Sequence, residues 1–541
     1  MIERSSGVLM PMSSLPSPYG IGTMGKEAFR FVDFLAAAAQ KYWQLLPLGP
    51  TGYGDSPYSS CSCFAGNPYL IDLELLVRDG LLTEEEVEAV NWGEDPAHTD
   101  YGRLYQERGP LLRKAYERGR EKFREEFDLF CNENARWLDN YTLYVSLKQH
   151  FNMKSWSDWP DEDIRMHRAN AVKKYTELLF PEMKLHAFIQ FLFFRQWKDL
   201  KAYAEKKEIK MIGDVPIYVA MDSADIWSEP QFFQLDAQYR PKEVAGVPPD
   251  AFTADGQLWG NPLFDWDRMK ADGYGWWIRR IEGATRLFDV IRIDHFRGME
   301  SYWAVPAGEK TARNGKWRPG PGMSLVGVLT QWFHGTEFIA EDLGYLTPKV
   351  RQLVKDSGLP GMKIMEFAFD AHGDSDYLPH CCEENSVCYL GTHDNDTVHG
   401  WLDTTTEEDH EFARRYMHIT GDEGWCWGMI RSGMATQSRL FVVQMQDLLE
   451  LDGSARMNTP GKEYGNWCWR MLPGAVTEEL TEKLRQYTMT FRRAEDIRLK
   501  EEAAAKAARE AAAKAAKEKA AVKAKAASKE TAKRKQLEKQ L

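Results

Sequence analysis

Long apolar runs are missing from this sequence. No stretch of 18 apolar residues occurs, which excludes a membrane-spanning helix. The chain starts Met-Ile-Glu-Arg-Ser-Ser, without an apolar signal region, so we expect a cytoplasmic protein. Its eight Cys include two pairs, Cys61 with Cys63 and Cys381 with Cys382, that are too close for ordinary disulfides. Free thiols in a reducing cytosol fit this pattern better.

Signatures of metal and nucleotide sites are missing as well. No His-x-x-x-His pair, calcium-loop spacing or doubled Cys-x-x-Cys motif occurs. No Gly-x-Gly-x-x-Gly or phosphate loop follows a predicted strand. We therefore expect no metal and no cofactor. The net charge of −12 argues against a nucleic-acid-binding body, which would normally be basic.

Aromatic residues, in contrast, are abundant. The 541 residues include 19 Trp, 22 Tyr and 26 Phe, and 43% of the chain is hydrophobic. Many rings will lie in the core, but such a surplus also suits a protein that stacks on planar ligand faces. The length allows one large barrel-type domain with insertions, or two or three smaller domains.

Eight short apolar segments recur between helical stretches and predict buried strands. Each is bounded by Gly, Pro or polar residues, as is typical of parallel strands covered on both faces. Eight such strands alternating with helices predict an α/β fold, a (β/α)8 TIM barrel with inserted helical subdomains. The predicted strands are Gly7–Met10, Tyr42–Leu46, Met211–Val215, Val290–Asp294, Phe338–Glu341, Met362–Phe367, Val387–Thr392 and Leu440–Gln444.

Two spacings between these strands are too long for plain βα units. Residues 72–205 are rich in helix formers and in Trp, Phe and Leu at helical spacing, so we expect a helical insertion there. A second insertion, of loops and helices, is expected over residues 219–289, with a Pro/Gly-rich stretch at Gly246–Asn261. Residues 1–499 would then form one catalytic barrel with both insertions.

The C-terminal segment, residues 500–541, differs from everything before it. It holds 13 Lys/Arg and 6 Glu, a net charge of +7, which leaves −19 on residues 1–499. Its long Ala runs predict a solvated helix that buries little. It could serve as an electrostatic tether to the acidic body or to an anionic partner. We favour the simpler interpretation, a solvated tail without a specific partner.

Three acidic motifs end predicted strands. They are Asp289-Val-Ile-Arg-Ile-Asp-His-Phe-Arg-Gly298, Phe338-Ile-Ala-Glu-Asp-Leu-Gly344 and Tyr389-Leu-Gly-Thr-His-Asp-Asn-Asp-Thr397. Active sites of such barrels lie at the C-terminal ends of the strands, so these acids should converge on one pocket. Metal binding by His393, Asp394 and Asp396 is a weaker alternative use of such acids.

The surroundings of each acid suggest a role. Arg292 and Asp294 share one face of a strand, and the guanidinium should lower the pKa of Asp294 and keep it ionised, as a nucleophile requires. Glu341 follows an apolar run, which should raise its pKa, as a general acid requires. Structural alternatives stay open: an Arg–Asp pair at the rim, a helix-start acid, and an Asx turn at Asp394. Two carboxyls in different protonation states are what glycoside cleavage needs.

These motifs, with others in the same order, resemble the 4-α-glucanotransferase (amylomaltase) family. The further motifs are Ser13-Ser-Leu-Pro16, Gln44-Leu-Leu-Pro-Leu-Gly-Pro-Thr-Gly52, Gly54-Asp-Ser-Pro-Tyr58, Gly213-Asp-Val-Pro-Ile217, Gln257-Leu-Trp-Gly-Asn-Pro262 and Gly465-Asn-Trp467. The resemblance covers about residues 5–495. It implies a retaining (β/α)8 enzyme of the α-amylase clan.

The resemblance also implies roles for individual residues. Asp294 would be the nucleophile, Glu341 the general acid/base and Asp394 the transition-state stabiliser. Trp259 would stack on glucose in the cleft. The remaining implied substrate-binding residues are Ser56, Tyr58, Asp214, Arg292, His295, His393 and Asn466.

The resemblance favours transfer of an α-1,4-glucan segment to the 4-hydroxyl of another glucan. The expected partners are malto-oligosaccharides and starch or glycogen chains. A loop carrying Phe252 and Trp259 suits a partial lid that keeps water from the glycosyl-enzyme. Ala251 departs from the family pattern, in which some relatives place a large aromatic. The alternatives are an α-glucan hydrolase with the same acids and a catalytically silent glucan-binding protein.

Overall fold

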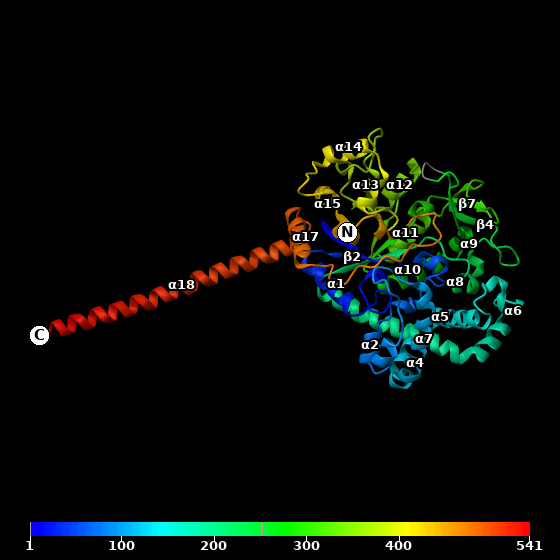
Figure 1. The fold of residues 1–541 in the computed structure, drawn as a ribbon, viewed down its shortest axis with the longest axis horizontal. Helices are drawn as coiled ribbons and strands as arrows, with labels where there is room; N and C mark the ends of the chain where they lie inside the picture. Colours follow the sequence, from blue (N-terminus) through cyan, green and yellow to red (C-terminus); the bar gives the residue numbers. More distant parts are fainter. Residues whose placement is uncertain (1, 250–252, 541) are drawn as a thin grey trace.

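A nearly closed ring of eight parallel strands forms the centre of the molecule. We describe residues 2–249 and 253–540 of a computed structural model (Figure 1). The strand order is β10-β11-β12-β1-β2-β3-β6-β9, and Ala340 N donates a hydrogen bond to Pro360 O (2.9 Å) where β9 meets β10. The strands are β1 (Ser5–Leu9), β2 (Tyr42–Gln44), β3 (Lys210–Val215), β6 (Val290–Ile293), β9 (Glu337–Ala340), β10 (Gly361–Ile364), β11 (Ser386–Tyr389) and β12 (Leu440–Gln444). This arrangement confirms the predicted (β/α)8 barrel.

Alternating burial explains why these short segments become strands. Leu9, Tyr42 and Ile212 belong to one apolar cluster that fills the barrel. Their neighbours Val8 and Trp43 belong to a second, larger cluster that includes the surrounding helices. Successive strand residues point to opposite faces, so each strand is apolar on both. The helices that follow barrel strands include α1 (Lys26–Ala37), α11 (Met323–Trp332), α12 (Pro348–Ser357), α13 (Val398–Thr404), α14 (Glu407–Met417), α15 (Trp425–Ala435), α16 (Met445–Leu448) and α17 (Glu478–Thr490).

A group of helices lies between β2 and β3, where the sequence predicts an insertion. Helices α5 and α7 pack along each other through rings such as Phe127 and Phe188, whose centroids are 5.3 Å apart. Helix α7 then runs into β3, which anchors the group to the barrel. The helices are α2 (Leu73–Arg78), α3 (Glu84–Glu88), α4 (Tyr101–Lys122), α5 (Arg124–His150), α6 (Glu162–Arg165) and α7 (Ala169–Lys206).

A sheet that the sequence did not predict joins the second long connection to the segment between β6 and β9. Strands β4 (Glu243–Val247) and β5 (Gln257–Pro262) pair antiparallel, and β4 also pairs with β7 (Ser301–Pro306), which pairs with β8 (Lys316–Pro319). The Pro/Gly-rich stretch predicted as a loop therefore includes parts of two strands. The predicted loop residues Ala251 and Phe252 lie outside the described residues. The helices here are α8 (Ala224–Ser228), α9 (Trp266–Ala271) and α10 (Gly275–Leu287).

The last helix, α18 (Glu495–Glu538), extends away from the barrel as one rod (Figure 1). None of its residues is buried. Only its first turns are held to the body, where Asp496 pairs with Lys41 (2.6 Å) and Lys500 pairs with Glu208 (2.7 Å). Among the described residues, no helix is both long and apolar enough to cross a membrane.

Candidate active site

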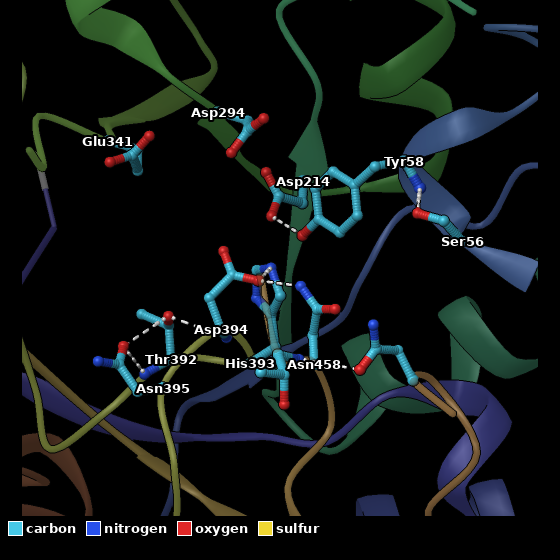
Figure 2. A network of polar contacts seen from close by, with 12 residues as sticks. Ser56, Tyr58, Asp214, Asp294, Glu341, Thr392, His393, Asp394, Asn395 and Asn458 are labelled. Carbon is cyan, nitrogen blue, oxygen red and sulfur yellow. Dashed lines mark hydrogen bonds and ion pairs between the residues drawn. The ribbon is translucent and has the colours of Figure 1, made fainter. Parts of the chain in front are cut away.

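Four acids from different strands gather at one end of the barrel. Asp214 lies near the end of β3, Asp294 follows β6, Glu341 follows β9, and Asp394 lies in the loop after β11. Figure 2 shows the carboxyl groups of Asp294, Glu341 and Asp394 around one space. Parallel strands bring their C-terminal ends together, so residues far apart in sequence meet there.

Glu341 is held by backbone groups in a buried position. Its Oε2 accepts a hydrogen bond from His295 N (2.6 Å), and its Oε1 accepts one from Leu343 N (2.8 Å). His295 has a left-handed backbone with φ of 47°, a strained conformation of the kind found at active sites. Burial raises the pKa of Glu341 to about 7, although Arg292 and the two N–H groups oppose this shift. The carboxyl is thus suited to exchange a proton near neutral pH.

Arg292 serves two carboxylates rather than one. Its Nη1 lies 2.5 Å from Asp214 Oδ2 and 3.3 Å from Asp294 Oδ1. The Asp214 oxygen also accepts a hydrogen bond from Tyr58 Oη (2.7 Å). The nearest partner of the guanidinium is therefore Asp214, which the sequence did not identify as its partner.

The predicted lowering of the Asp294 pKa is wrong. Burial raises the pKa of this carboxyl, Arg292 lowers it, and the neighbouring carboxylates of Asp214 and Glu341 raise it again. The outcome is a pKa well above the usual range of an aspartate. The physical reason is the presence of other acids nearby. One guanidinium shared between two carboxylates does not offset burial and the neighbouring negative charges.

Asp394 is held at both its side chain and its backbone. Asn458 Nδ2 donates to Asp394 Oδ1 (2.6 Å), and Arg456 Nη2 donates to the Asp394 carbonyl oxygen (2.7 Å). Nε2 of His393 lies 3.4 Å from the same Oδ1. Burial lowers the pKa of His393, which favours its neutral form.

Aromatic rings form a wall beside the acids. The rings of Tyr58 and His393 stack with centroids 5.1 Å apart and an interplanar angle of 18°. Trp467 packs against both, at 5.7 Å from Tyr58 and 6.0 Å from His393. Trp259, on β5, is 37% exposed and meets the His295 ring edge-on at 4.8 Å. Such flat surfaces can stack on sugar faces.

Two predicted substrate-binding residues lie in supporting positions. Ser56 caps the short turn of Tyr58 by accepting a hydrogen bond from its backbone N (3.2 Å). Asn466 holds its own loop, because its Oδ1 accepts from Thr459 N (3.0 Å) and its Nδ2 donates to Lys462 O (2.9 Å). Ser56 is thus connected to the acid cluster indirectly, through Tyr58. The contacts of Asn466 given above lie within its own loop.

Arg456, Asn458 and the contacts of Trp467 were not predicted from the sequence. All three lie in an irregular segment after β12, where no periodicity marks them. The run Arg456-Met-Asn-Thr-Pro460 precedes the recognised Gly465-Asn-Trp467 and was the available signal. Among the described residues no group of three or more His, Cys, Asp or Glu could hold a metal ion.

Comparisons with known proteins agree on one family. The sequence profile of the 4-alpha-glucanotransferase family matches residues 10–477. The chain is 46% identical to a 4-alpha-glucanotransferase of Clostridium butyricum, with 90% of this chain and 100% of that protein covered. It is 45% identical to that of Thermus thermophilus, covering 90% and 98%. The solved amylomaltase of Streptococcus agalactiae in complex with acarbose superposes with a TM-score of 0.89 at 40% identity, covering 91% and 100%. The chain belongs to the 4-alpha-glucanotransferase family.

Proposed function

We propose that this enzyme transfers α-1,4-glucan segments by a double displacement at Asp294. The Asp294 carboxylate attacks C1 of the donor sugar while Glu341 gives its proton to the departing 4-oxygen. This forms a covalent glycosyl-enzyme and releases the shortened glucan. Glu341 then takes the proton from the 4-hydroxyl of an acceptor, whose oxygen attacks C1 and frees Asp294.

The observation that carries this proposal is the unequal pair of carboxyls. Glu341 has a pKa of about 7 and bonds to two backbone N–H groups, whereas Asp294 forms an ion pair with Arg292. The pKa of Asp294 is itself raised, but Asp294 contacts a guanidinium and Glu341 does not. That contact favours the charged form of Asp294, so we assign the proton that the two carboxyls hold between them to Glu341. Asp394 would then stabilise the positive charge that develops on the donor ring.

We further propose that malto-oligosaccharides and longer starch or glycogen chains are the substrates. The exposed face of Trp259 and the half-buried ring of Tyr58, which is backed by His393, supply flat surfaces for glucose units. The acarbose complex of the streptococcal amylomaltase supports an α-glucan ligand. The eight free Cys fit the reducing cytoplasm, where we place the enzyme.

Incubation with maltotriose alone tests the reaction. Transfer predicts glucose and a ladder of longer maltodextrins, while the total of reducing ends stays constant. Hydrolysis predicts a steady rise in reducing ends without longer products. No change in product sizes would indicate a silent glucan-binding protein. Asp294→Asn serves as the matched inactive control.

A further inference from the structure

Positive charge is concentrated at the far end of α18, in residues 514–541, which we call the outer half of α18. Residues 500–513 hold three Lys/Arg and three Glu, whereas residues 514–541 hold ten Lys/Arg and three Glu. All of the +7 net charge therefore lies in the outer part. At 1.5 Å per residue, Lys514 stands about 29 Å beyond the start of the helix. That distance is several times the Debye length of about 8 Å at physiological salt. Salt therefore screens most of the attraction between this positive charge and the acidic body, and the charge stays available to a partner.

The charges surround the helix on all sides. Lys514 and Lys523 are nine residues apart, which places them about 180° apart around the axis. Among the described residues of the outer half, the large apolar ones are Val522 and Leu537, and both are exposed. A helix that lies on a membrane needs a broad apolar face, which is missing here. A flat protein surface would contact only the charged side chains on one side of the helix.

We propose that the outer half of α18 binds double-stranded DNA through the phosphates that line the major groove. The B-DNA major groove is about 12 Å wide and admits an α-helix, so phosphates on both sides can meet charges on both sides of the helix. The segment has no aromatic side chain to stack on bases, and binding would be independent of base sequence. This surface is separate from glucan transfer and does not rest on it.

The position of the helix leaves the catalytic end free. Its first turns pair with Lys41 and Glu208, which precede β2 and β3 and so lie at the N-terminal ends of the barrel strands. The acids lie at the C-terminal ends, on the opposite side of the barrel. A nucleic acid bound to the outer half would localise the enzyme without covering its cleft.

Fluorescence anisotropy of a labelled 20-base-pair DNA duplex tests this proposal. The full chain is compared with a variant carrying Lys→Gln at 514, 517, 519, 523, 525, 529 and 533, which keeps residues of similar helix propensity. The full chain should bind at 50 mM salt, with a slope of log K against log salt of about −6 for seven phosphate contacts. The variant should bind at least tenfold more weakly with unchanged maltotriose activity.

Three results would overturn the proposal. These are equal duplex binding by both proteins, no duplex binding at 50 mM salt, and binding to vesicles containing phosphatidylserine without binding to the duplex. Sedimentation that shows self-association of the full chain but not of the Gln variant, without duplex binding, would identify a second copy as the partner instead.

A second, independent observation concerns the loop that carries Asp394. Besides its bond to the Asp394 carbonyl, Arg456 pairs with Asp396 Oδ2 (3.1 Å) and donates from Nε to Asn458 O (2.8 Å). Asn458 N in turn donates to His393 O (3.1 Å). The segments 393–396 and 456–458 are thus tied together, and the Asn458 amide meets the Asp394 carboxylate directly. The Asp394 side chain is 46% exposed, so few groups besides Asn458 and His393 are placed to fix its rotamer.

We infer that Asn458 is a positioning residue that aims Asp394 at the sugar ring, and this inference rests on the proposed role of Asp394. Loss of one hydrogen bond to a charged group corresponds to about a 10- to 100-fold lower kcat for Asn458→Ala, with little change in KM. The test is a double-mutant cycle with Asp394→Ala. On that background Asn458→Ala should have no further effect.

The outcomes separate the two claims. If Asp394→Ala keeps near-normal kcat, the role of Asp394 is wrong. Suppose instead that Asp394→Ala lowers kcat strongly. The positioning role is then wrong if Asn458→Ala alone keeps a normal kcat, or if it lowers kcat by the same factor with and without Asp394→Ala. Thermal unfolding of each variant shows whether lost activity reflects lost folding.

Discussion

At the scale of single residues, the chemistry depends on which carboxyl groups of the acid cluster are ionised, because few positive charges lie near them. Arg292 pairs with both Asp214 and Asp294, and Glu341 has its pKa raised to about 7 by burial. Asp294 must be ionised and Glu341 protonated at the same time. The pH range in which both conditions hold is therefore narrow. The two pKa values that limit it are properties of the interacting pair and not of either residue alone.

The first prediction concerns the alkaline limit of that window. Because Glu341 must carry a proton to act as an acid, kcat/KM for maltotriose should fall as pH rises through about 7. Because the pKa of Asp294 is also raised, the acidic limit should lie above the usual range of an aspartate. A pH profile of kcat/KM measures both. With Glu341→Gln and an α-maltosyl fluoride donor, which needs no acid, the alkaline fall in the glycosylation step should disappear; a profile unchanged from the parent would contradict the assignment.

The second prediction concerns the nucleophile. Asp294→Asn keeps the shape of the side chain but cannot form the covalent intermediate, so kcat should fall by about 10⁴-fold or more. Calorimetric titration with a maltodextrin should still show binding, because the aromatic wall of Tyr58 and His393 is intact. Near-normal turnover would place the nucleophile elsewhere.

At the scale of secondary-structure elements, close packing of helices on strands sets the position of the acids. Gly213 on β3 lies directly under the Phe288 ring, and a Cβ there would come within 2.0 Å of that ring. Phe288 ends α10 and leads into β6, so this contact fixes β3 against β6. Asp214 and Asp294 extend from these two strands. A side chain at Gly213 would therefore disturb both stability and the acid cluster.

The third prediction compares two glycines. Gly213→Ala should destabilise the protein by about 1–3 kcal/mol, because the added methyl overpacks the contact with Phe288. Gly327→Ala is the matched control: Gly327 lies in α11 with nothing near its Cβ, so Ala should stabilise by about 0.5–1 kcal/mol. Differential scanning calorimetry should show Tm values shifted in opposite directions. Equal Tm values for the two variants would refute this account of the packing.

At the scale of the whole molecule, an acidic catalytic body carries a basic rod. Residues 1–499 hold −19 and residues 500–541 hold +7. The 4-alpha-glucanotransferase of Clostridium butyricum is covered completely by 90% of this chain. The rod joins the body through its first turns, by the Lys41–Asp496, Lys500–Glu208 and Arg485–Glu501 pairs. Folding of the barrel and function of its cleft should therefore be independent of the outer rod.

The fourth prediction follows from this separation. Removal of residues 514–541 should leave Tm and the rate of maltotriose disproportionation unchanged, because that part of α18 buries no residue. Calorimetry and product analysis measure the two quantities. A chain shortened at Ala494 is the comparison, since it also loses the three pairs that anchor α18, Lys41–Asp496, Lys500–Glu208 and Arg485–Glu501. Surface ion pairs contribute about 0–1 kcal/mol each. A large loss of activity on removing 514–541 alone would show that the rod acts on the cleft.

The sequence by itself determined the barrel and the acids. Short apolar segments predicted all eight barrel strands, because burial on both faces is a local property that each segment displays. The acids at the strand ends followed from the same pattern, since a barrel brings those ends together. Roles for individual acids came from the family resemblance, and they stay predictions until mutants are measured.

Only the tertiary structure decided which groups share charge and support one another. The sheet of β5, β4, β7 and β8 was missed because its central pairing, β4 with β7, is non-local and β8, Lys316–Pro319, is exposed along its whole length. The Arg292–Asp214 pair and the Asn458–Asp394 bond join residues 78 and 64 positions apart. The pKa of Asp294 depends on just such neighbours. Sequence periodicity records which face of an element is buried, but not which distant side chain will lie across from it.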